Sequence, residues 1–535
     1  MKKMPRINTF LNHKIKKVKQ GHFRLLLAGL LTFSIFACDD EKKLLDSQNQ
    51  SSPSSSRVDG DIDKLYDERS NLQREFSKSL AKSLSQSKML RDIIRTKALE
   101  MFDEDYELLY EIIKDDKVEN NLTVEELITK NITDKKELKK LDTEYPTLTI
   151  LVPTLPKDCF NPQKWNTATE IPKVAVRLHS TNDVPIIDGD GSEKLMEGKY
   201  TPGFPVIVVK ENERLVSDKH KDFRNYKTKE FTSNRGVRFK FFSEEFDRKA
   251  NKLKNKSGRI GFNHPSSIDP FIISAYNNYK NVSGWHRDQI YYNITPTQTN
   301  GEFSYDFKDG LRSFKMIGNP TVAYNQLADQ TDDPRINNVT SGSHWTGGSF
   351  EFRVSCLINA KNGIGSELIT GFGAAPDELF ELNYDAVYVP LFGTIYLLNN
   401  IQLKQKELNI PILNWNLNEY AKTIKISIEE VDIQTTTVVS ESSSVKFAAN
   451  FGLDGGILKK IGLKLGGSVE TTQTQTYQKT FTQGNNDLGS VSVDFADDVV
   501  IGEGVFIFGL PIYSTREYNT GWYSISFEPI RVQGF

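Results

Sequence analysis

The stretch of the sequence most suggestive of chemistry is Asp188–Glu193, in which Asp188, Asp190 and Glu193 are interspersed with glycine and serine. Carboxylates spaced in this way offer hard oxygen ligands to Ca²⁺. A calcium loop of the EF-hand type needs a further ligand position and a glutamate at its twelfth position, and the sequence has neither. The two Asp-Gly pairs are also typical of tight hairpin turns. We therefore expect a turn between two strands here, with a metal site as the alternative.

Three widely spaced histidines, His264, His286 and His344, are candidate zinc ligands by residue type. None of them has a second potential ligand two, three or four residues further on, which is the usual spacing in zinc sites. The sequence therefore predicts surface or core histidines and no metal ligand.

Motifs of the common catalytic classes are missing from the sequence. There is no G-x-S-x-G nucleophile turn, no phosphate loop, no G-x-G-x-x-G and no H-E-x-x-H. The pairs Gly363/Gly365 and Gly371/Gly373 lack a third glycine at the required spacing and are expected to lie in loop turns. Two carboxylates for glycoside hydrolysis can converge from any two strands, and 70 Asp and Glu residues leave the pair undetermined.

The chain has three cysteines, Cys38, Cys159 and Cys356. In an oxidising compartment Cys159 and Cys356 can form a disulfide, and closing so long a loop would stabilise the fold by roughly 3–5 kcal/mol in the loop-entropy model. The alternative is two buried free thiols that pack as small hydrophobic side chains.

Residues 1–37 have the layout of a secretion signal. Residues 1–24 carry eight Lys or Arg and no acid, and the uncharged run Leu25–Ala37 is too short to span a membrane as a helix. Cys38 follows Ala37 directly, and this arrangement resembles the lipobox of bacterial lipoproteins. The resemblance implies that residues 1–37 are removed and that Cys38 becomes an acylated first residue, carrying palmitate or a similar chain, that anchors the protein in a membrane.

Loss of the eight leading cations changes the formal charge from −2 to about −10. This balance argues against nucleic-acid binding, which needs clustered positive charge. Residues 38–60 are rich in polar residues and are expected to form a flexible tether. The acidic residues after Cys38 are similar to the surface-export signal of Bacteroidetes-type lipoproteins. We therefore expect an outer-membrane protein exposed at the cell surface, with inner-membrane retention as the alternative.

Residues 61–143 predict a packed helical segment. Thr123 and Glu126 form a capping-box signature for one helix, and another short helix is expected over Asp105–Lys114. Two longer helices are expected where apolar residues recur every three, four or seven positions, namely in Ile62–Leu84 and Met89–Phe102.

Residues 144–330 predict a β-rich domain of mixed structure. One helix is expected in Ser267–Tyr276, with Pro270 in its first turn. Short apolar runs bounded by Pro, Gly, Asn or Asp give the expected strands, which are 148–152, 174–178, 206–209, 214–217 and 237–242.

A polar stretch precedes a C-terminal domain, 344–535, that is expected to be an antiparallel β-sandwich or barrel because many strands with Gly-rich turns follow one another. The expected strands are 350–358, 386–389, 395–398, 423–431, 438–453, 462–482, 490–495, 504–508 and 522–529. The whole chain is therefore expected to be α+β, with a short N-terminal helical segment followed by two β-rich regions.

Residues 438–482 are unusual among these strands. Apolar and polar residues alternate over 445–454, residues 467–481 are rich in Ser, Thr and Gln, and the apolar stretch Gly455–Ile461 lies between them. Long Ser/Thr-rich strands joined by an apolar tip resemble the membrane-inserting hairpin of aerolysin-type pore formers. The resemblance implies that Ile457, Leu458 and Ile461 contact a membrane or a partner. An ordinary solvent-facing hairpin of a sandwich is the alternative.

The sequence thus predicts a lipid-anchored cell-envelope protein that acts as a surface binding or structural module. Its ligand is an unidentified protein or glycan, and neither a cofactor nor catalytic activity is expected. Two alternatives stay open. One is a pore-forming or membrane-perturbing protein that uses residues 438–482, and the other is a carbohydrate-active enzyme.

Overall fold

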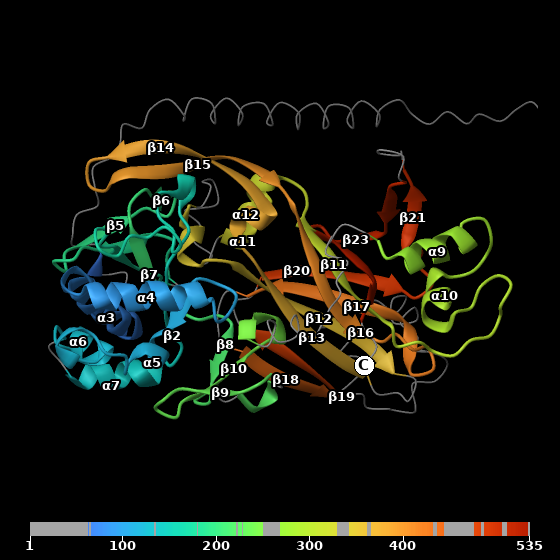
Figure 1. The fold of residues 1–535 in the computed structure, drawn as a ribbon, viewed down its shortest axis with the longest axis horizontal. Coiled ribbons are helices and arrows are strands. Elements are labelled where there is room, and N and C mark those ends of the chain that lie inside the picture. Colours follow the sequence, from blue (N-terminus) through green and yellow to red (C-terminus); the bar gives the residue numbers. More distant parts are fainter. Residues whose placement is uncertain are drawn as a thin grey trace, which may run out of the picture. The chain divides into compact units, whose positions relative to one another are not determined.

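The computed structural model describes residues 62–532 apart from 64–65, 133–134, 179, 221–222, 227, 250–267, 329–341, 361–364, 432–435, 443–475, 483–485 and 505–510. These residues belong to one unit, Asp59–Phe535, that contains two large hydrophobic cores. Most side chains of the first core come from residues 62–209, and those of the second core come from residues 272–527. Helices and short strands form the first core, and mostly long antiparallel strands form the second (Figure 1).

Two consecutive helices, α3 (Glu68–Gln86) and α4 (Lys88–Glu100), begin at side-chain caps. The Asp67 carboxylate accepts a hydrogen bond from the Ser70 amide at 2.7 Å, and the Ser87 hydroxyl accepts one from the Leu90 amide at 2.9 Å. Most of the periodic apolar residues of both helices are buried in the first core, as the sequence predicts, but Met89 is 43% exposed.

Helix α3 packs on a six-stranded sheet whose strand order is β1-β2-β7-β3-β4-β5. Strands β3 and β7 are parallel, and the other neighbours are antiparallel. This sheet confirms the strands expected near residues 148, 174 and 206. Its members are β1 (Glu107–Leu109), β2 (Leu148–Leu151), β3 (Lys173–Val176), β4 (Val184–Ile187), β5 (Glu193–Met196) and β7 (Val206–Glu211).

The helix expected over Asp105–Lys114 is wrong in its first half. Glu107–Leu109 forms strand β1, which pairs with Leu151–Thr149 of β2, and only the four-residue helix α5 (Tyr110–Ile113) follows. All three residues of β1 are buried. Sheet pairing therefore decides the local structure here, because the run is too short for helical period to prevail.

Further short elements belong to both halves of the molecule. The Thr123–Glu126 capping box is present, with hydrogen bonds of 2.7 and 3.0 Å, and Pro270 occupies the first turn of α9, whose cap is Asp269. The elements are α6 (Val124–Thr129), α7 (Lys135–Glu144), β8 (Leu215–Ser217), β9 (Phe231–Thr232), β10 (Arg238–Phe241), α9 (Pro270–Tyr279) and α10 (His286–Tyr292).

Two four-stranded antiparallel sheets enclose the second core, with orders β16-β11-β24-β23 and β13-β12-β17-β20. The Phe314 ring of β11 lies 4.8 Å from Phe352 of β12 and 5.2 Å from Phe372 of β13, which joins the two sheets face to face. The expected α+β class with a sandwich-like C-terminal region is confirmed. The strands are β11 (Phe307–Met316), β12 (Phe350–Ala360), β13 (Gly365–Ala374), β16 (Gln405–Leu413), β17 (Tyr420–Glu430), β20 (Asn486–Asp494), β23 (Glu517–Asn519) and β24 (Tyr523–Arg531).

The expectation of loop turns at Gly371 and Gly373 is wrong, since both lie inside β13. A Cβ atom on Gly371 would come within 2.9 Å of the Phe242 ring. The absent side chain of Gly371 therefore leaves room for an aromatic ring that packs onto the sheet.

One hairpin joins the two cores. Strands β14 (Phe380–Val389) and β15 (Gly393–Leu403) pair along their length, and β6 (Tyr200–Pro202) pairs with β15. Phe380 and Ile401 belong to the second core, whereas Ile395 belongs to the first. Two short helices, α11 (Pro320–Ala328) and α12 (Pro376–Leu379), lie against this hairpin.

Two smaller strand pairs remain. Strand β18 (Thr436–Ser442) pairs with β19 (Thr476–Thr482), and β21 (Val500–Glu503) pairs with β22 (Tyr513–Thr515), both antiparallel. Within the described residues, no helix is long and apolar enough to cross a membrane.

Candidate functional site

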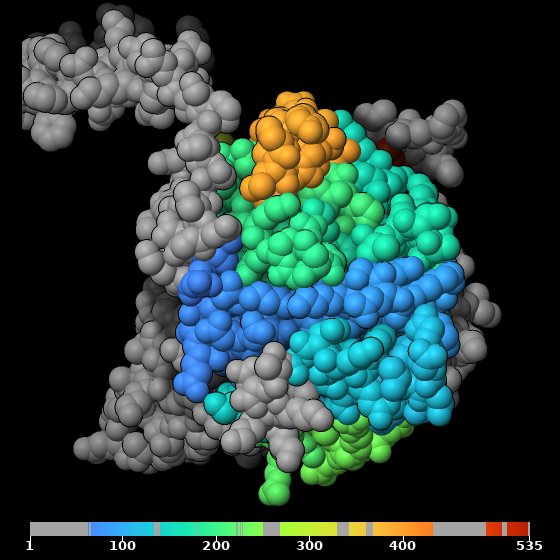
Figure 2. All heavy atoms as spheres, turned by 90° about the vertical axis from the view of Figure 1, so that its left-hand side faces the viewer, coloured from blue at the N-terminus to red at the C-terminus, as the bar shows by residue number. Residues whose placement is uncertain are grey.

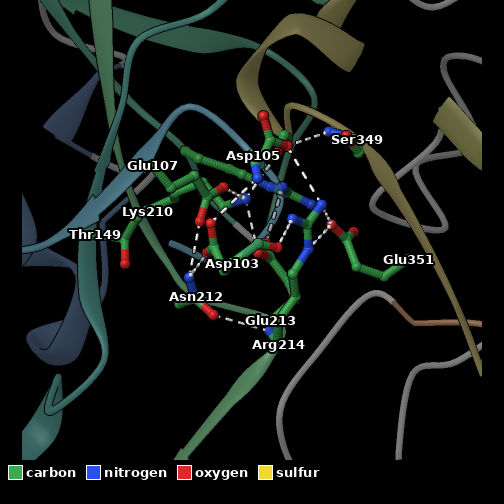
Figure 3. A network of polar contacts seen from close by, with 12 residues as sticks. Asp103, Asp105, Glu107, Thr149, Lys210, Asn212, Glu213, Arg214, Ser349 and Glu351 are labelled. Atoms are coloured by element: carbon green, nitrogen blue, oxygen red, sulfur yellow. Dashed lines mark hydrogen bonds and ion pairs between the residues drawn. The ribbon is translucent and has the colours of Figure 1, made fainter. Parts of the chain in front are cut away.

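A cluster of charged side chains lies at the end of the first sheet, and we call it the buried charge network (Figure 3). Its members come from three segments that are distant in the sequence, namely the turn that leads into β1, the connection from β7 to β8, and the start of β12. They are Asp103, Asp105, Glu107, Lys210, Asn212, Glu213, Arg214, Ser349 and Glu351.

Lys210 is the first cation of the buried charge network, and its side chain is 1% exposed. Its ammonium group lies 2.7 Å from a Glu107 oxygen and 2.7 Å from a Glu213 oxygen, and it donates to the Gly347 carbonyl at 2.6 Å. These three contacts match the three N–H donors of a lysine, so the group is fully satisfied without water.

Arg214 is the second cation, and its guanidinium is almost as deeply buried. It lies 2.6 Å from a Glu351 oxygen and 3.3 Å from an Asp105 oxygen, and it donates to the Asp103 carbonyl at 2.6 Å. The planar fork of an arginine suits such a multiple contact. Through Arg214, the turn before β1 is bonded to β12.

Burial controls the protonation of the acids in the network. Desolvation raises the pKa of Glu107 well above its usual value despite the attraction of Lys210, and it raises the pKa of Asp103. It also raises the pKa of Glu351 to about 7, although Arg214 acts in the opposite direction. For Lys210, burial alone would lower the pKa, but Glu107 and Glu213 outweigh it and the pKa is raised.

This arrangement can bond segments together, but it is poorly placed for chemistry on a substrate. Asp103, Glu107 and Glu351 are each at most 5% exposed, and each accepts hydrogen bonds from a protein side chain. A glycan therefore has no access to these carboxylates, and the buried charge network is not the acid pair of a glycosidase.

The second core contains a simpler buried ion pair. Arg287 donates to Asp309 Oδ1 at 2.8 and 3.0 Å, and the Tyr291 hydroxyl donates to the other oxygen of Asp309 at 2.6 Å. Arg287 also donates to the Asp497 carbonyl at 2.9 Å. This pair fixes α10 on β11 and on the turn after β20.

The expected turn at Asp188–Glu193 is confirmed, because β4 and β5 pair antiparallel on either side of it. Gly191 has a φ of +90°, a conformation that favours glycine. The Asp188 carboxylate lies 2.6 Å from the Lys173 ammonium and 3.2 Å from that of Lys194. Its oxygens are thus occupied by cations of the protein. In the described part of the chain, no group of three or more His, Cys, Asp or Glu side chains is arranged to hold a metal ion.

Cys159 and Cys356 are free thiols in the structure, as in the second of the two sequence-based alternatives. Cys356 lies in the second core, and Cys159 packs against the first, where its sulfur lies 3.9 Å from the Pro202 carbonyl oxygen. Burial raises the pKa of Cys159 to about 11 and that of Cys356 to about 12. Both thiols are therefore protonated at neutral pH and poorly nucleophilic.

Of the three candidate histidines, His286 and His344 lie among the described residues, and both are buried and bonded within the protein. His286 Nδ1 accepts from the Val499 amide at 3.1 Å, and His344 contacts the hydroxyls of Tyr324 and Tyr384 through its two nitrogens. Burial lowers the pKa of His344 to about 4, so it is neutral at physiological pH. Several other predicted positions lie outside the described residues, namely Cys38, His264, Ile457, Leu458, Ile461 and most of the strand expected at 504–508.

The two arms of the expected 438–482 hairpin are paired at their base. Thr436 pairs with Thr482 and Ser442 pairs with Thr476. On the chain, the arms are attached to the end of the β17–β20 pair, where Glu430 pairs with Asn486. Strand β19 nevertheless lies beside β13, at the opposite edge of that sheet (Figure 1). The paired arms are thus folded back across the sheet from which they extend.

A small cavity between α5 and α7 has a volume of about 10 Å³ and is lined by Tyr110, Lys114, Asp142 and Lys219, among others. The Tyr110 hydroxyl is buried without a hydrogen-bond partner among the described residues. A cavity of this size holds one water molecule, which would satisfy that hydroxyl.

Sequence reasoning missed the buried charge network. Its centre is the run Lys210-Glu-Asn-Glu-Arg214, which reads as a polar connection between two short strands. Apart from Glu213, the acidic partners of Lys210 and Arg214 lie more than a hundred residues away along the chain. The one available signal is the density of charge directly after the apolar run Val206–Val209, and such charge usually faces solvent.

No protein-family model, no curated protein and no solved structure matches this chain.

Proposed function

We propose that this protein is anchored in the cell envelope by a lipid on Cys38 and acts on a membrane through the hairpin whose arms are β18 and β19. The observation that carries the membrane-acting role is the position of the paired arms. They extend from β17 and β20 on the chain, yet they are folded back so that β19 lies beside β13.

The geometry is suited to a hairpin that swings outward. If the arms turn away from β13 into line with β17 and β20, they lengthen an antiparallel ribbon that already exists. Strands β17 and β20 have 11 and 9 residues, and β18 and β19 add 7 residues each. A membrane-spanning β-strand needs only about 9–11 residues.

The composition of the arms supports the same role. Residues 436–442 read TTVVSES and residues 476–482 read TYQKTFT, so hydroxyl-bearing and apolar residues are mixed along both. A strand that lines a pore must offer one apolar and one polar face. Membrane-spanning β-strands are hard to recognise in a sequence, because only every second residue of each strand faces the lipid.

Release of a dye from liposomes tests the membrane-acting role. We expect residues 38–535 to release the dye, and we expect the combined substitutions Ile457→Ser, Leu458→Ser and Ile461→Ser to reduce the rate at least about tenfold. A tenfold loss corresponds to about 1.4 kcal/mol, and three apolar side chains withheld from lipid exceed that value.

The control is Ile171→Ser, which changes an isoleucine that is 47% exposed on another part of the surface. This variant should release dye like the unaltered protein. Unchanged release by the triple variant, or equal loss in both variants, would overturn the role of the hairpin. Circular dichroism verifies that each variant is folded.

The lipid anchor is tested separately. Whole cells fed an alkyne-labelled fatty acid should label the protein, and Cys38→Ser should abolish the label while Cys159→Ser keeps it. A Cys38→Ser protein that is still labelled contradicts the proposed anchor. Digestion of the protein by protease added to intact cells tests the proposed surface location, and digestion only after lysis contradicts it.

A second candidate function is the binding of a protein partner at the cell surface, and the exposed strand β14 favours it. This strand is the outer member of the hairpin that joins the two cores. Pull-down of a partner by the soluble unit, unaffected by the triple substitution at Ile457, Leu458 and Ile461, would support this function.

A further inference from the structure

Strand β14 lies at the edge of its sheet. Its ten residues pair with β15 on one side, from Phe380 opposite Leu403 to Val389 opposite Gly393. Among the strands that the structure describes, none pairs with its other side. The β14–β15 hairpin stands out from the surrounding surface in Figure 2, where it is orange, and β14 is its outer strand in Figure 1.

An unpaired edge of this length is normally protected against other chains. Proteins protect edges with proline, with charged side chains, above all lysine, or with a bulge that twists the edge strand away. The charged residues of β14 are acidic, so they disfavour a second copy of the same strand and leave the edge open to a basic one. The sequence of β14, FELNYDAVYV, contains neither proline nor lysine. The irregular residue of the hairpin is Asn399, since Asn383 pairs with Asn400 and Tyr384 pairs with Leu398. The bulge therefore falls on β15, and β14 keeps a regular backbone.

The two halves of β14 bury opposite faces. In the first half, Phe380 and Leu382 pack into the second core, and Glu381 and Asp385 face outward. In the second half, Val387 and Val389 pack against the first core, and Ala386 and Tyr388 face outward. Tyr388 is 74% exposed. The outward-facing side chains of both halves of β14 are therefore accessible to a chain that pairs with its free edge.

The charge on this edge is acidic. Glu381 and Asp385 are exposed and lie on the same face of β14, and neither has an ion-pair partner among the described residues. A second copy of this chain that paired its own β14 here would bring two more carboxylates and no cation. A basic strand would instead place an opposite charge beside each acid, which is the favourable cross-strand arrangement.

We propose that β14 is a strand-addition site for an extended, basic segment of another protein. The backbone of that segment bonds to the free edge, lysine or arginine side chains spaced four residues apart face Glu381 and Asp385, and an apolar side chain packs on Tyr388. This inference rests on the second candidate function and is independent of membrane insertion.

Fluorescence anisotropy with two short peptides tests the proposal on the soluble unit. The first peptide, TKVTVKVTV, carries lysines four residues apart, and the second, TEVTVEVTV, carries glutamates in their place. We expect only the lysine peptide to bind, more weakly at high salt. The double substitution Glu381→Lys with Asp385→Lys should weaken the lysine peptide by about fivefold or more and make the glutamate peptide bind.

Glu302→Lys is the matched control, because Glu302 is exposed and likewise has no ion pair among the described residues. It should leave both affinities unchanged. Amide hydrogen exchange provides a second measurement, in which saturating lysine peptide should slow exchange within residues 380–389. The proposal is overturned if charge reversal changes neither affinity or if protection appears elsewhere. It is also overturned if the unit forms dimers that Tyr388→Lys abolishes.

Discussion

Arg214 in the buried charge network and Arg287 in the second core are both buried, but they differ in the number of carboxylates around them. In the buried charge network, Lys210 and Arg214 lie among five carboxylates, those of Asp103, Asp105, Glu107, Glu213 and Glu351. A third buried cation, Arg177, lies 3.0 Å from Glu213, so five acids face three cations. In the second core, Arg287 faces the single carboxylate of Asp309, which also accepts from the Tyr291 hydroxyl. Burial is similar at both sites, so the ratio of acid to base is what distinguishes them.

This ratio has two consequences. Where acids are in excess, removal of one cation leaves several buried charges without compensation, and some of the acids retain protons at neutral pH. Where acid and base are matched, removal of one partner leaves a single charge that a neutral substitution can remove. The network therefore behaves as a unit, and the pair behaves as two separable residues.

The largest effect is expected for Arg214→Leu. This change leaves Glu351 and Asp105 without their cation and the Asp103 carbonyl without its donor, so we expect a loss of about 5 kcal/mol in the free energy of unfolding. Urea denaturation followed by circular dichroism measures it. A loss no greater than that of Arg287→Leu would contradict the comparison.

A smaller loss, about 3 kcal/mol, is expected for Arg287→Leu. Tyr291 still donates to Asp309 in this variant, and Asp309→Asn in addition should recover part of the loss because it removes the remaining charge. The same denaturation experiment applies. Failure of the second substitution to recover any stability would mean that the pair is as interdependent as the network.

The pH dependence of stability provides a third comparison. Because the pKa of Glu351 is about 7 in the folded protein and lower in the unfolded chain, the folded state keeps a proton that the unfolded state releases between about pH 4.5 and 7. Stability therefore falls as pH rises through this window, by up to about 1.4 kcal/mol per pH unit for this group.

Glu351→Gln should remove that contribution while keeping an oxygen acceptor for Arg214. Glu528, in the second core, also has a pKa of about 7 because of burial, so Glu528→Gln is the matched variant. Unfolding midpoints measured from pH 5 to 8 should flatten in both variants, and an unchanged slope in Glu351→Gln would refute this origin of the pH dependence.

The smallest effect is expected for Arg235→Gln. Arg235 contacts Asp115 at 2.8 Å and Glu125 at 2.7 Å, but its side chain is 33% exposed. Solvent screens such contacts, so the change should cost about 0.5 kcal/mol. A loss comparable to that of the buried arginines, measured in the same way, would show that acid excess matters more than burial.

Local patterns in the sequence predicted much of the fold. The apolar period of α3 and α4, the cap at Thr123 and the turn at Asp188–Glu193 depend on neighbours within a few residues, and each is confirmed. The sequence did not predict strands whose residues contact side chains that are distant along the chain. In β11, for example, Asp309 interrupts the apolar pattern because it pairs with Arg287, and in β13 Gly371 makes room for the Phe242 ring.

The candidate sites were less predictable than the fold. The hairpin arms were recognised by composition because long Ser/Thr-rich strands are uncommon, whereas their return across the sheet to β13 depends on tertiary packing. The edge position of β14 depends on which strands pair, and the expected strand at 386–389 covers only its second half. The long-range partners of Lys210 and Arg214 could not be predicted from the sequence, because they come together only in the folded chain.

The strand order of the second core determines when it can form. Strand β11 lies between β16 and β24, so residues 307–316 find one neighbour only after residues 523–531 have been made. Such a high contact order slows folding, because the loop must close before its contacts stabilise it. Residues 62–209 supply most of the first core and can associate while the rest of the chain is still emerging. During synthesis, therefore, the strands of the second core remain unpaired for longest.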